Sequence, residues 1–423
     1  MTTTSTLGLA PVRERLANGV TLLVKETRVQ PAVTISATMS AGSVCDPSGV
    51  EGVAHLLSRL LDRGAGTRAA DEVADILDLR GVSPLISVTR HATTVTCDCL
   101  AEDVETVLET VCDMLRAPHC VDQEIERCRG QLLTQLRQDE DSPSTRALEA
   151  VMPLLYGADH PYGRTPKGSA ATVEGIDRRQ LLDFHAAWFA PDRLTLVLVG
   201  DIGVSAAVAL VTRVCGDWGG RAVSVPAFRP PPVPTRRRLV IPMPAKAQAD
   251  IVYGFTTILR SDPAFHAYWI MNNVLGQYGI GGRLGRSIRE RQGMAYYAGS
   301  MFEAGHIAGP LLVRAGVNAD NVDRAIASID TEVATMARDG VTDEELASAK
   351  RYLVGSTPRS LETNEGIARF LQTAELFDLG LDYDHRLPAL VQSVTADEVA
   401  EAARRTLVTE HASIVIAGPY EAL

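Results

Sequence analysis

The feature that most limits how this chain can fold is a weak internal repeat. The helical pattern that opens with Asp122-Gln-Glu-Ile returns as Asp343-Glu-Glu-Leu, an offset of 221 between positions 122 and 343. Leu198-Val-Gly returns as Ile416-Ala-Gly at an offset of 218, and Asp103-Val matches Asn321-Val at the same offset. A coincidence would not keep nearly one offset across so much of the chain, so we expect two copies of one structural unit.

A proline-rich segment separates the two copies. Residues 225–234 read Val-Pro-Ala-Phe-Arg-Pro-Pro-Pro-Val-Pro, with five prolines in ten positions. Proline has no backbone N–H and a fixed φ, so this segment can form neither a helix nor an interior strand. We therefore predict an N-terminal domain at 1–221, an extended linker at 222–236 and a C-terminal domain at 237–423. The length of 423 residues also exceeds what one compact core usually holds.

Strands and helices are both predicted in the first copy, and the repeat implies the same kinds of element in the second. β-branched and alternating residues predict strands at 20–24, 32–39, 92–100 and 194–200. Helical spacing of apolar residues predicts helices at 69–79, 102–116, 121–138, 145–156, 177–189, 203–216 and 264–275. The fold class is therefore α+β, with two homologous domains that each pack helices on a mostly antiparallel sheet.

Composition excludes several classes of partner. The net charge is −11 without long single-sign runs, which argues against nucleic acid and anionic membrane surfaces. Residues 1–6 are polar and resemble no signal peptide, and no run of about 18 apolar residues could span a bilayer, so we expect a cytoplasmic protein. The seven cysteines include no C-x-x-C pair and are expected to be reduced core thiols.

The stretch 52–61 is the first of two that bear on chemistry. Its apolar residues recur at helical spacing, and His55 and Arg59, four apart, share one face with Ser58 beside them. In the inverted zinc motif H-x-x-E-H, these three places hold a ligand, the general base and a second ligand. Arginine repels a cation, and serine cannot take a proton as a carboxylate can. We therefore expect no metal or other cofactor in this chain.

This frame resembles the insulinase/pitrilysin family of zinc peptidases. The position that matches the family's third zinc ligand is Gln135, because Thr134-Gln-Leu-Arg followed by Asp139 and Pro143 is similar to the family's Glu-Glu-x-Arg…Asp-x-Pro. His55 alone survives of the three ligands, so the metal positions His55, Ser58, Arg59 and Gln135 are degenerate. The resemblance covers essentially the whole chain and implies two domains that face each other as a clamshell.

The second stretch is 281–297, which is similar to the family's G-x-S-R-L-x-x-x-L-R-E-x-x-G-L-A-Y signature. The resemblance implies that Arg289 and Tyr296 bind the substrate carbonyl and stabilise the tetrahedral intermediate at a facing zinc site. A guanidinium and a phenol are donors suited to oxyanion charge. The alternative is a solvated Arg289 and a Tyr296 at the edge of the core. The glycine-rich segment 275–282 lacks the ending of a phosphate-binding loop and is expected to be a flexible loop that contacts peptide.

The resemblance also implies a division of labour. In heterodimeric bacterial members of the family, one subunit has H-x-x-E-H and the other has the Arg/Tyr pair with a decayed zinc motif. We predict that this chain is the second kind, inactive alone, and that Arg289 and Tyr296 act in trans on a peptide substrate. The partner would be a homologous H-x-x-E-H subunit that holds the zinc. The alternative is a non-enzymatic peptide-binding or scaffold protein, either a homodimer or similar to the family's core subunits.

Overall fold

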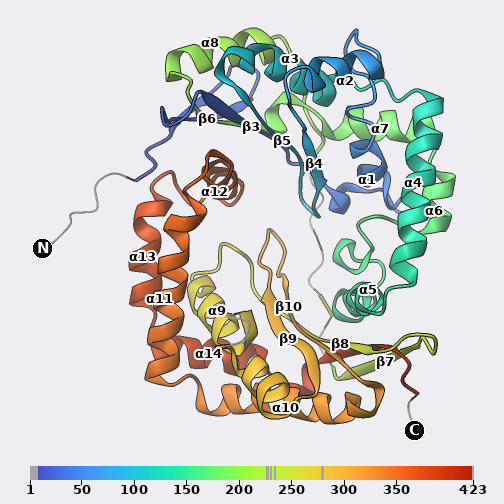
Figure 1. Cartoon of the computed structure of the whole chain (residues 1–423), viewed down its shortest axis with the longest axis vertical. Helices are drawn as coiled ribbons and strands as arrows, with labels where there is room; N and C mark the ends of the chain where they lie inside the picture. The colour runs from blue at the N-terminus through green and yellow to red at the C-terminus, as the bar shows by residue number, and fades with distance from the viewer. Residues whose placement is uncertain (1–7, 225–227, 229–230, 233–234, 278–280, 422–423) are drawn as a thin grey trace, which may run out of the picture. The chain divides into compact units, whose positions relative to one another are not determined.

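The chain forms two compact units, each with its own sheet (Figure 1). The computed structural model describes residues 8–224, 228, 231–232, 235–277 and 281–421. The first unit comprises Met1–Leu136, Thr165–Pro226 and Pro358–His385, and the second comprises Arg137–Arg164, Ala227–Thr357 and Arg386–Leu423. Within the predicted linker 222–236, residues 225–227, 229–230 and 233–234 lie outside the described residues. Residues 278–280 of the glycine-rich segment do so as well.

The first sheet has six strands in the order β1-β2-β6-β3-β5-β4. β2 pairs with β6 in parallel, and every other neighbouring pair is antiparallel. The strands are β1 (Val12–Arg15), β2 (Thr21–Glu26), β3 (Ala32–Met39), β4 (Leu85–Val88), β5 (Thr93–Leu100) and β6 (Leu194–Gly200). β1 and β4, the two edge strands, are absent from the sequence-based prediction.

The second sheet repeats this arrangement in the order β7-β11-β8-β10-β9, with β7 and β11 as its parallel pair. Its strands are β7 (Arg237–Pro242), β8 (Ala249–Thr256), β9 (Ala295–Phe302), β10 (Pro310–Val317) and β11 (Ser413–Gly418). The starts of β3 and β8, at 32 and 249, and of β5 and β10, at 93 and 310, are both offset by 217. The repeat and the α+β class are confirmed, whereas the clamshell arrangement stays a prediction.

Helices cover both sheets, and α3 and α8 lie along one face of the first (Figure 1). In the first half of the chain they are α1 (Val53–Ser58), α2 (Ala70–Asp78), α3 (Val104–Arg116), α4 (Asp122–Glu140), α5 (Pro143–Tyr156), α6 (Ala170–Gly175), α7 (Arg178–Trp188) and α8 (Val204–Cys215). In the second half they are α9 (Phe265–Asn272), the π-helices η5 (Asn273–Gln277) and η7 (Gly285–Arg291), α10 (Val322–Asp339), α11 (Asp343–Ser360), α12 (Asn364–Leu376), α13 (Tyr383–Ser393) and α14 (Ala396–Thr406). The helix predicted at 264–275 is thus divided between α9 and η5.

Each half of the sequence supplies a helix to the sheet of the other half. α12 packs on β6 and β3, where Ile367 and Leu371 meet Val197, and Gln372 donates hydrogen bonds to the carbonyl oxygens of Ser36 (3.0 Å) and Thr195 (3.2 Å). In the same way, α5 packs on β8 and β11. The compact units therefore differ from the predicted domains 1–221 and 237–423, because two segments, Arg137–Arg164 and Pro358–His385, are exchanged.

The reason for the exchange lies in strand β6. Leu196 and Leu198 point into the main core of the first unit, whereas Val197 and Val199 point to the opposite face, and all four are fully buried. A strand that is apolar on both faces needs a cover on each side. For the second face, that cover is α12. Among the described residues, no helix is long and apolar enough to cross a membrane.

Candidate functional site

The N-terminus of helix α1, which carries His55, is held in place by a buried carboxylate and a glycine. Asp46 in the turn before it is buried, and its carboxylate accepts hydrogen bonds from the N–H groups of Gly52 (2.7 Å) and Ala54 (3.1 Å). Gly52 has a φ of 96°, and a side chain there would begin 2.5 Å from the carbonyl oxygen of Lys167. Asp46 therefore caps the helix, and only glycine fits its first position. The helix is shorter than the predicted 52–61 and ends at Ser58.

The degenerate metal positions come together in space, as the resemblance to zinc peptidases implies. Arg59 follows the last residue of α1, and its Nη2 donates a hydrogen bond to Oε1 of Gln135 on α4. The hydroxyl of Ser58 donates to the carbonyl oxygen of His55 in the preceding turn (2.7 Å). His55, Ser58 and Arg59 line a cavity of about 460 Å³, beside the edge strand β4.

These residues do not fit a zinc ion. Zinc takes neutral or anionic ligands with free lone pairs, but here a permanent cation stands at one ligand position. The amide oxygen of Gln135, at another, accepts a hydrogen bond from that cation. Within the described ranges, no group of three His, Cys, Asp or Glu side chains could hold a metal. The structure therefore supports no metal chemistry at this cavity.

The Arg/Tyr stretch belongs to the second unit and runs from a π-helix into an edge strand. η7 carries Arg289, and Tyr296 is the second residue of β9. Between them, Gly293 has a φ of +61° and donates its N–H to the carbonyl oxygen of Arg289 (3.1 Å). Glycine adopts this left-handed conformation without strain, so the glycine of the signature turns the chain sharply from helix to strand.

Both side chains are exposed, Tyr296 to 66%. Neither makes an ion pair or a side-chain hydrogen bond with any residue in the described part of the chain. Tyr296 is therefore more exposed than an aromatic at the edge of the core, whereas the exposed Arg289 agrees with the other half of the alternative, a solvated arginine. An exposed guanidinium and an exposed phenol are free to donate hydrogen bonds to a ligand, and their catalytic roles stay a prediction.

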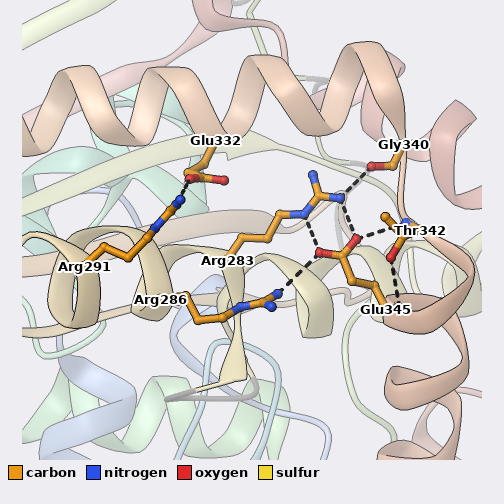
Figure 2. A network of polar contacts seen from close by, with 7 residues as sticks. All are labelled: Arg283, Arg286, Arg291, Glu332, Gly340, Thr342 and Glu345. Atoms are coloured by element: carbon orange, nitrogen blue, oxygen red, sulfur yellow. Dashed lines mark hydrogen bonds and ion pairs between the residues drawn. The ribbon is translucent and has the colours of Figure 1, made fainter.

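A buried ion pair anchors the start of the Arg/Tyr stretch to α11 (Figure 2). Arg283 donates from Nε and Nη2 to the two carboxylate oxygens of Glu345, at 2.8 and 2.6 Å, and from Nη2 to the carbonyl oxygen of Gly340 at 2.9 Å. The two side chains are only 11% and 17% exposed. This two-pronged geometry is the strongest form of arginine–carboxylate contact.

Glu345, the third residue of α11, also caps the start of that helix. Its carboxylate accepts the N–H of Thr342 (3.0 Å), and the Thr342 hydroxyl accepts the N–H of Glu345 (3.2 Å), so the pair forms a capping box. Arg286 approaches the same carboxylate at 3.4 Å, and Arg291 pairs with Glu332 on α10 at 3.1 Å (Figure 2). The buried Arg283–Glu345 pair is therefore what fastens the segment that carries Arg289, because the pair formed by the exposed Arg291 contributes little. This anchor is absent from the sequence-based prediction, although the spacing Thr342-x-x-Glu345 is typical of a capping box.

The anchor controls the charge of Glu345. Burial is the largest single influence on this carboxyl and disfavours its charged form, but the hydrogen bonds from Arg283 and the Thr342 backbone, together with the charges of Arg283 and Arg286, outweigh it. The pKa of Glu345 therefore lies below its ordinary value. A lowered carboxyl pKa means that the stabilisation is present above the ordinary pKa and is lost as the pH falls through the folded-state pKa.

We expect Arg283→Ala to destabilise the second unit by about 3 kcal/mol, because it leaves a buried carboxylate without its cation. Thermal and urea unfolding at pH 7 measure the loss. The matched control is Arg338→Ala, which removes an exposed arginine paired with Asp339 and should leave stability nearly unchanged. The difference between Arg283→Ala and the natural chain should shrink as the pH falls through the lowered pKa of Glu345. A difference that persists at acid pH would contradict the assigned ion pair.

Comparisons with known proteins identify relatives of this chain. A family model described as insulinase (peptidase family M16) matches residues 21–162, and one described as peptidase M16 inactive domain matches residues 175–353. An uncharacterized zinc protease of Mycobacterium tuberculosis is 26% identical over 415 residues, covering 97% of this chain and 94% of that protein. A non-peptidase homolog of Helicobacter pylori is 24% identical, covering 90% and 87%. A crystal structure of a peptidase M16 inactive domain from Pseudomonas fluorescens has a TM-score of 0.91 at 26% identity, covering 98% and 99%.

Proposed function

This chain belongs to the insulinase family, peptidase family M16, as a non-catalytic member, and we propose that it is one subunit of a heterodimeric zinc metallopeptidase. A homologous subunit with an intact H-x-x-E-H would hold the zinc, and this chain would present Arg289 and Tyr296 to the peptide. The supporting observation is a contrast between two sites. Arg59 and Gln135 are hydrogen-bonded to each other at the metal positions, whereas the side chains of Arg289 and Tyr296 are exposed and have no hydrogen-bonding partner in the described part of the chain.

The proposed chemistry is stabilisation of developing charge. When a peptide bond is attacked by water, its carbonyl oxygen gains negative charge. The guanidinium of Arg289 and the hydroxyl of Tyr296 can each donate a hydrogen bond to that oxygen or to the neighbouring peptide backbone. Fixed donors act well because they need no reorganisation during the reaction. The Arg283–Glu345 anchor supplies that fixed position for the helix that bears Arg289.

The test is reconstitution with a zinc-bearing homologue. This chain, the homologue and their mixture are assayed with unfolded, internally quenched peptides, and size-exclusion chromatography checks whether a complex forms. We expect the mixture to cleave on the order of 10²-fold faster than the homologue alone, and this chain alone to be inactive. A complex that cleaves no faster than the homologue alone would contradict the proposal.

The second candidate function is a peptide-binding protein without catalysis, and the edge strand β4 favours it. β4 pairs with β5 on one side only among the described residues, and its Ile86, Ser87 and Val88 line the cavity beside His55. An exposed strand edge can accept an extended peptide as a further strand. Peptide binding by the isolated chain, with no gain in cleavage in any mixture, would support this candidate over the first.

A further inference from the structure

The cavity beside α1 carries an excess of positive charge. Arg59 and Arg63 lie four positions apart and both line it, together with one carboxylate, Asp62. Asp62 lies 3.3 Å from Nε of Arg63, so these two charges offset each other. On α4 nearby, Arg127 and Glu124 form their own pair at 3.5 Å. Arg59 is therefore the cation of this group that has no carboxylate partner among the described residues.

The hydrogen-bonding capacity of Arg59 is also largely unused. A guanidinium has five N–H donors in a planar fork. The side-chain bond that Arg59 makes within the described residues goes to Gln135, a neutral amide that cannot offset the charge. Nε of Arg59 is buried without a hydrogen-bond partner in the described part of the chain, whereas Nε of Arg63 faces Asp62. The guanidinium of Arg59 lines the cavity with no anionic partner among the described residues, and a ligand carboxylate would supply one.

The shape of the cavity limits what that ligand can be. One wall is the edge strand β4, whose free edge suits an extended peptide backbone. Arg59 and Arg63 line the same cavity, and guanidinium groups match carboxylate geometry. We propose that this cavity binds a carboxylate carried by an extended peptide, with Arg59 as the principal cation and Arg63 beside it. The carboxylate is either the peptide's C-terminus or an acidic side chain.

This site needs neither zinc nor a second subunit. It lies wholly in the first unit of this chain, whereas Arg289 and Tyr296 lie in the second. Binding at the cavity is measured on the isolated chain, without any cleavage assay. Its failure would therefore leave the proposed role of Arg289 and Tyr296 untouched, and the reverse also holds.

The experiment is fluorescence anisotropy of the full-length chain with labelled eight-residue peptides at low ionic strength. One pair of peptides differs only in a free or an amidated C-terminus. A second, amidated pair differs only in one internal Glu or Gln. We expect a carboxylate peptide in at least one pair to bind about tenfold more tightly than its neutral counterpart, as one charge-assisted hydrogen bond would provide. The pair that discriminates identifies the source of the carboxylate.

Two substitutions assign the binding to Arg59. Arg59→Gln removes the charge and should weaken binding of the carboxylate peptide by about 10- to 100-fold. Gln135→Glu should weaken it similarly, because the new carboxylate would pair with Arg59, which already donates a hydrogen bond to position 135. This variant should melt no lower than the natural chain, so it remains informative even where Arg59→Gln folds poorly. Arg179→Gln, which changes the charge equally at an exposed position on α7, is the control and should bind normally.

Three results would overturn the inference. The first is equal binding of charged and neutral peptides in both pairs. The second is unchanged binding by Gln135→Glu. The third is an equal loss in Arg179→Gln, which would mean that the peptides respond only to the overall charge of the chain.

Discussion

The triple substitution Ser58→Glu, Arg59→His and Gln135→Glu is expected to make this chain bind one equivalent of zinc. The hydrogen bond between Arg59 and Gln135 shows that positions 59 and 135 face each other across α1 and α4. His55 lies one turn before position 59 and lines the same cavity. The substitutions therefore place two imidazoles and a carboxylate around one point, with a glutamate as base, and they remove the cation that repels the metal.

Metal analysis after dialysis measures this change. The natural chain should contain well under one equivalent of zinc, and the triple variant close to one. The control is the double variant Ser58→Glu/Gln135→Glu, which keeps Arg59 and should stay free of metal because the guanidinium pairs with the new carboxylates. Stoichiometric zinc in the natural chain would contradict the interpretation that Arg59 prevents zinc from binding at these positions.

The second large effect is expected at the Arg/Tyr pair. In a complex with a zinc-bearing homologue, Arg289→Ala should lower the rate of peptide cleavage on the order of 10²-fold or more, because it removes one donor to the developing oxyanion. Tyr296→Phe, which removes only the hydroxyl, should cause a loss of the same order. Steady-state cleavage by each variant complex, with complex formation checked in parallel, measures both effects.

A measurement of stability distinguishes a loss of catalytic function from a folding defect. Arg289 and Tyr296 are exposed, so either substitution should change the free energy of unfolding by less than about 0.5 kcal/mol. Arg291→Ala is the matched control, since it removes an exposed arginine two positions away that pairs with Glu332. Its complex should cleave at nearly the natural rate. Equal losses in Arg289→Ala and Arg291→Ala would mean that the segment as a whole matters, not the guanidinium of Arg289.

The interior strands of the first sheet could be predicted from sequence, and its edge strands could not. The apolar run at 194–200 and the alternation near 32–39 and 92–100 became β6, β3 and β5 with bounds that agree to within one residue. β1 and β4 are four residues long and partly exposed, so neither shows a period that a pattern could reveal. Yet β4 forms a wall of the cavity beside His55, which sequence reasoning alone could not place.

The sequence also could not predict that α5 and α12 each pack on the sheet of the other half of the chain. Helical spacing shows that residues 145–156 form an amphipathic helix, but it does not show which sheet the apolar face covers. That choice depends on the far face of each sheet, where residues such as Val197 and Val199 need a cover. The repeat itself, which rests on a constant offset, was visible in the sequence and is confirmed by the matching strand orders.

The sequence predicted the contacts of the zinc-motif half of the candidate site better than those of the Arg/Tyr half. The spacing of the zinc-motif frame correctly brought Arg59 and Gln135 together across 76 positions. The Arg283–Glu345 anchor joins residues 62 positions apart. The local sequence around either residue does not indicate which residue it pairs with. The exposure of Tyr296 likewise depends on β9 being an edge strand, which only the sheet order shows.

The proposed division of labour is tested most directly by one comparison of cleavage rates. A zinc-bearing homologue is assayed at a saturating concentration of the natural chain and of its Arg289→Ala variant. We predict that the natural chain raises the rate of peptide cleavage on the order of 10²-fold and that the variant binds equally well but gives little increase. Equal stimulation by both chains would contradict the role of this chain as the donor of Arg289.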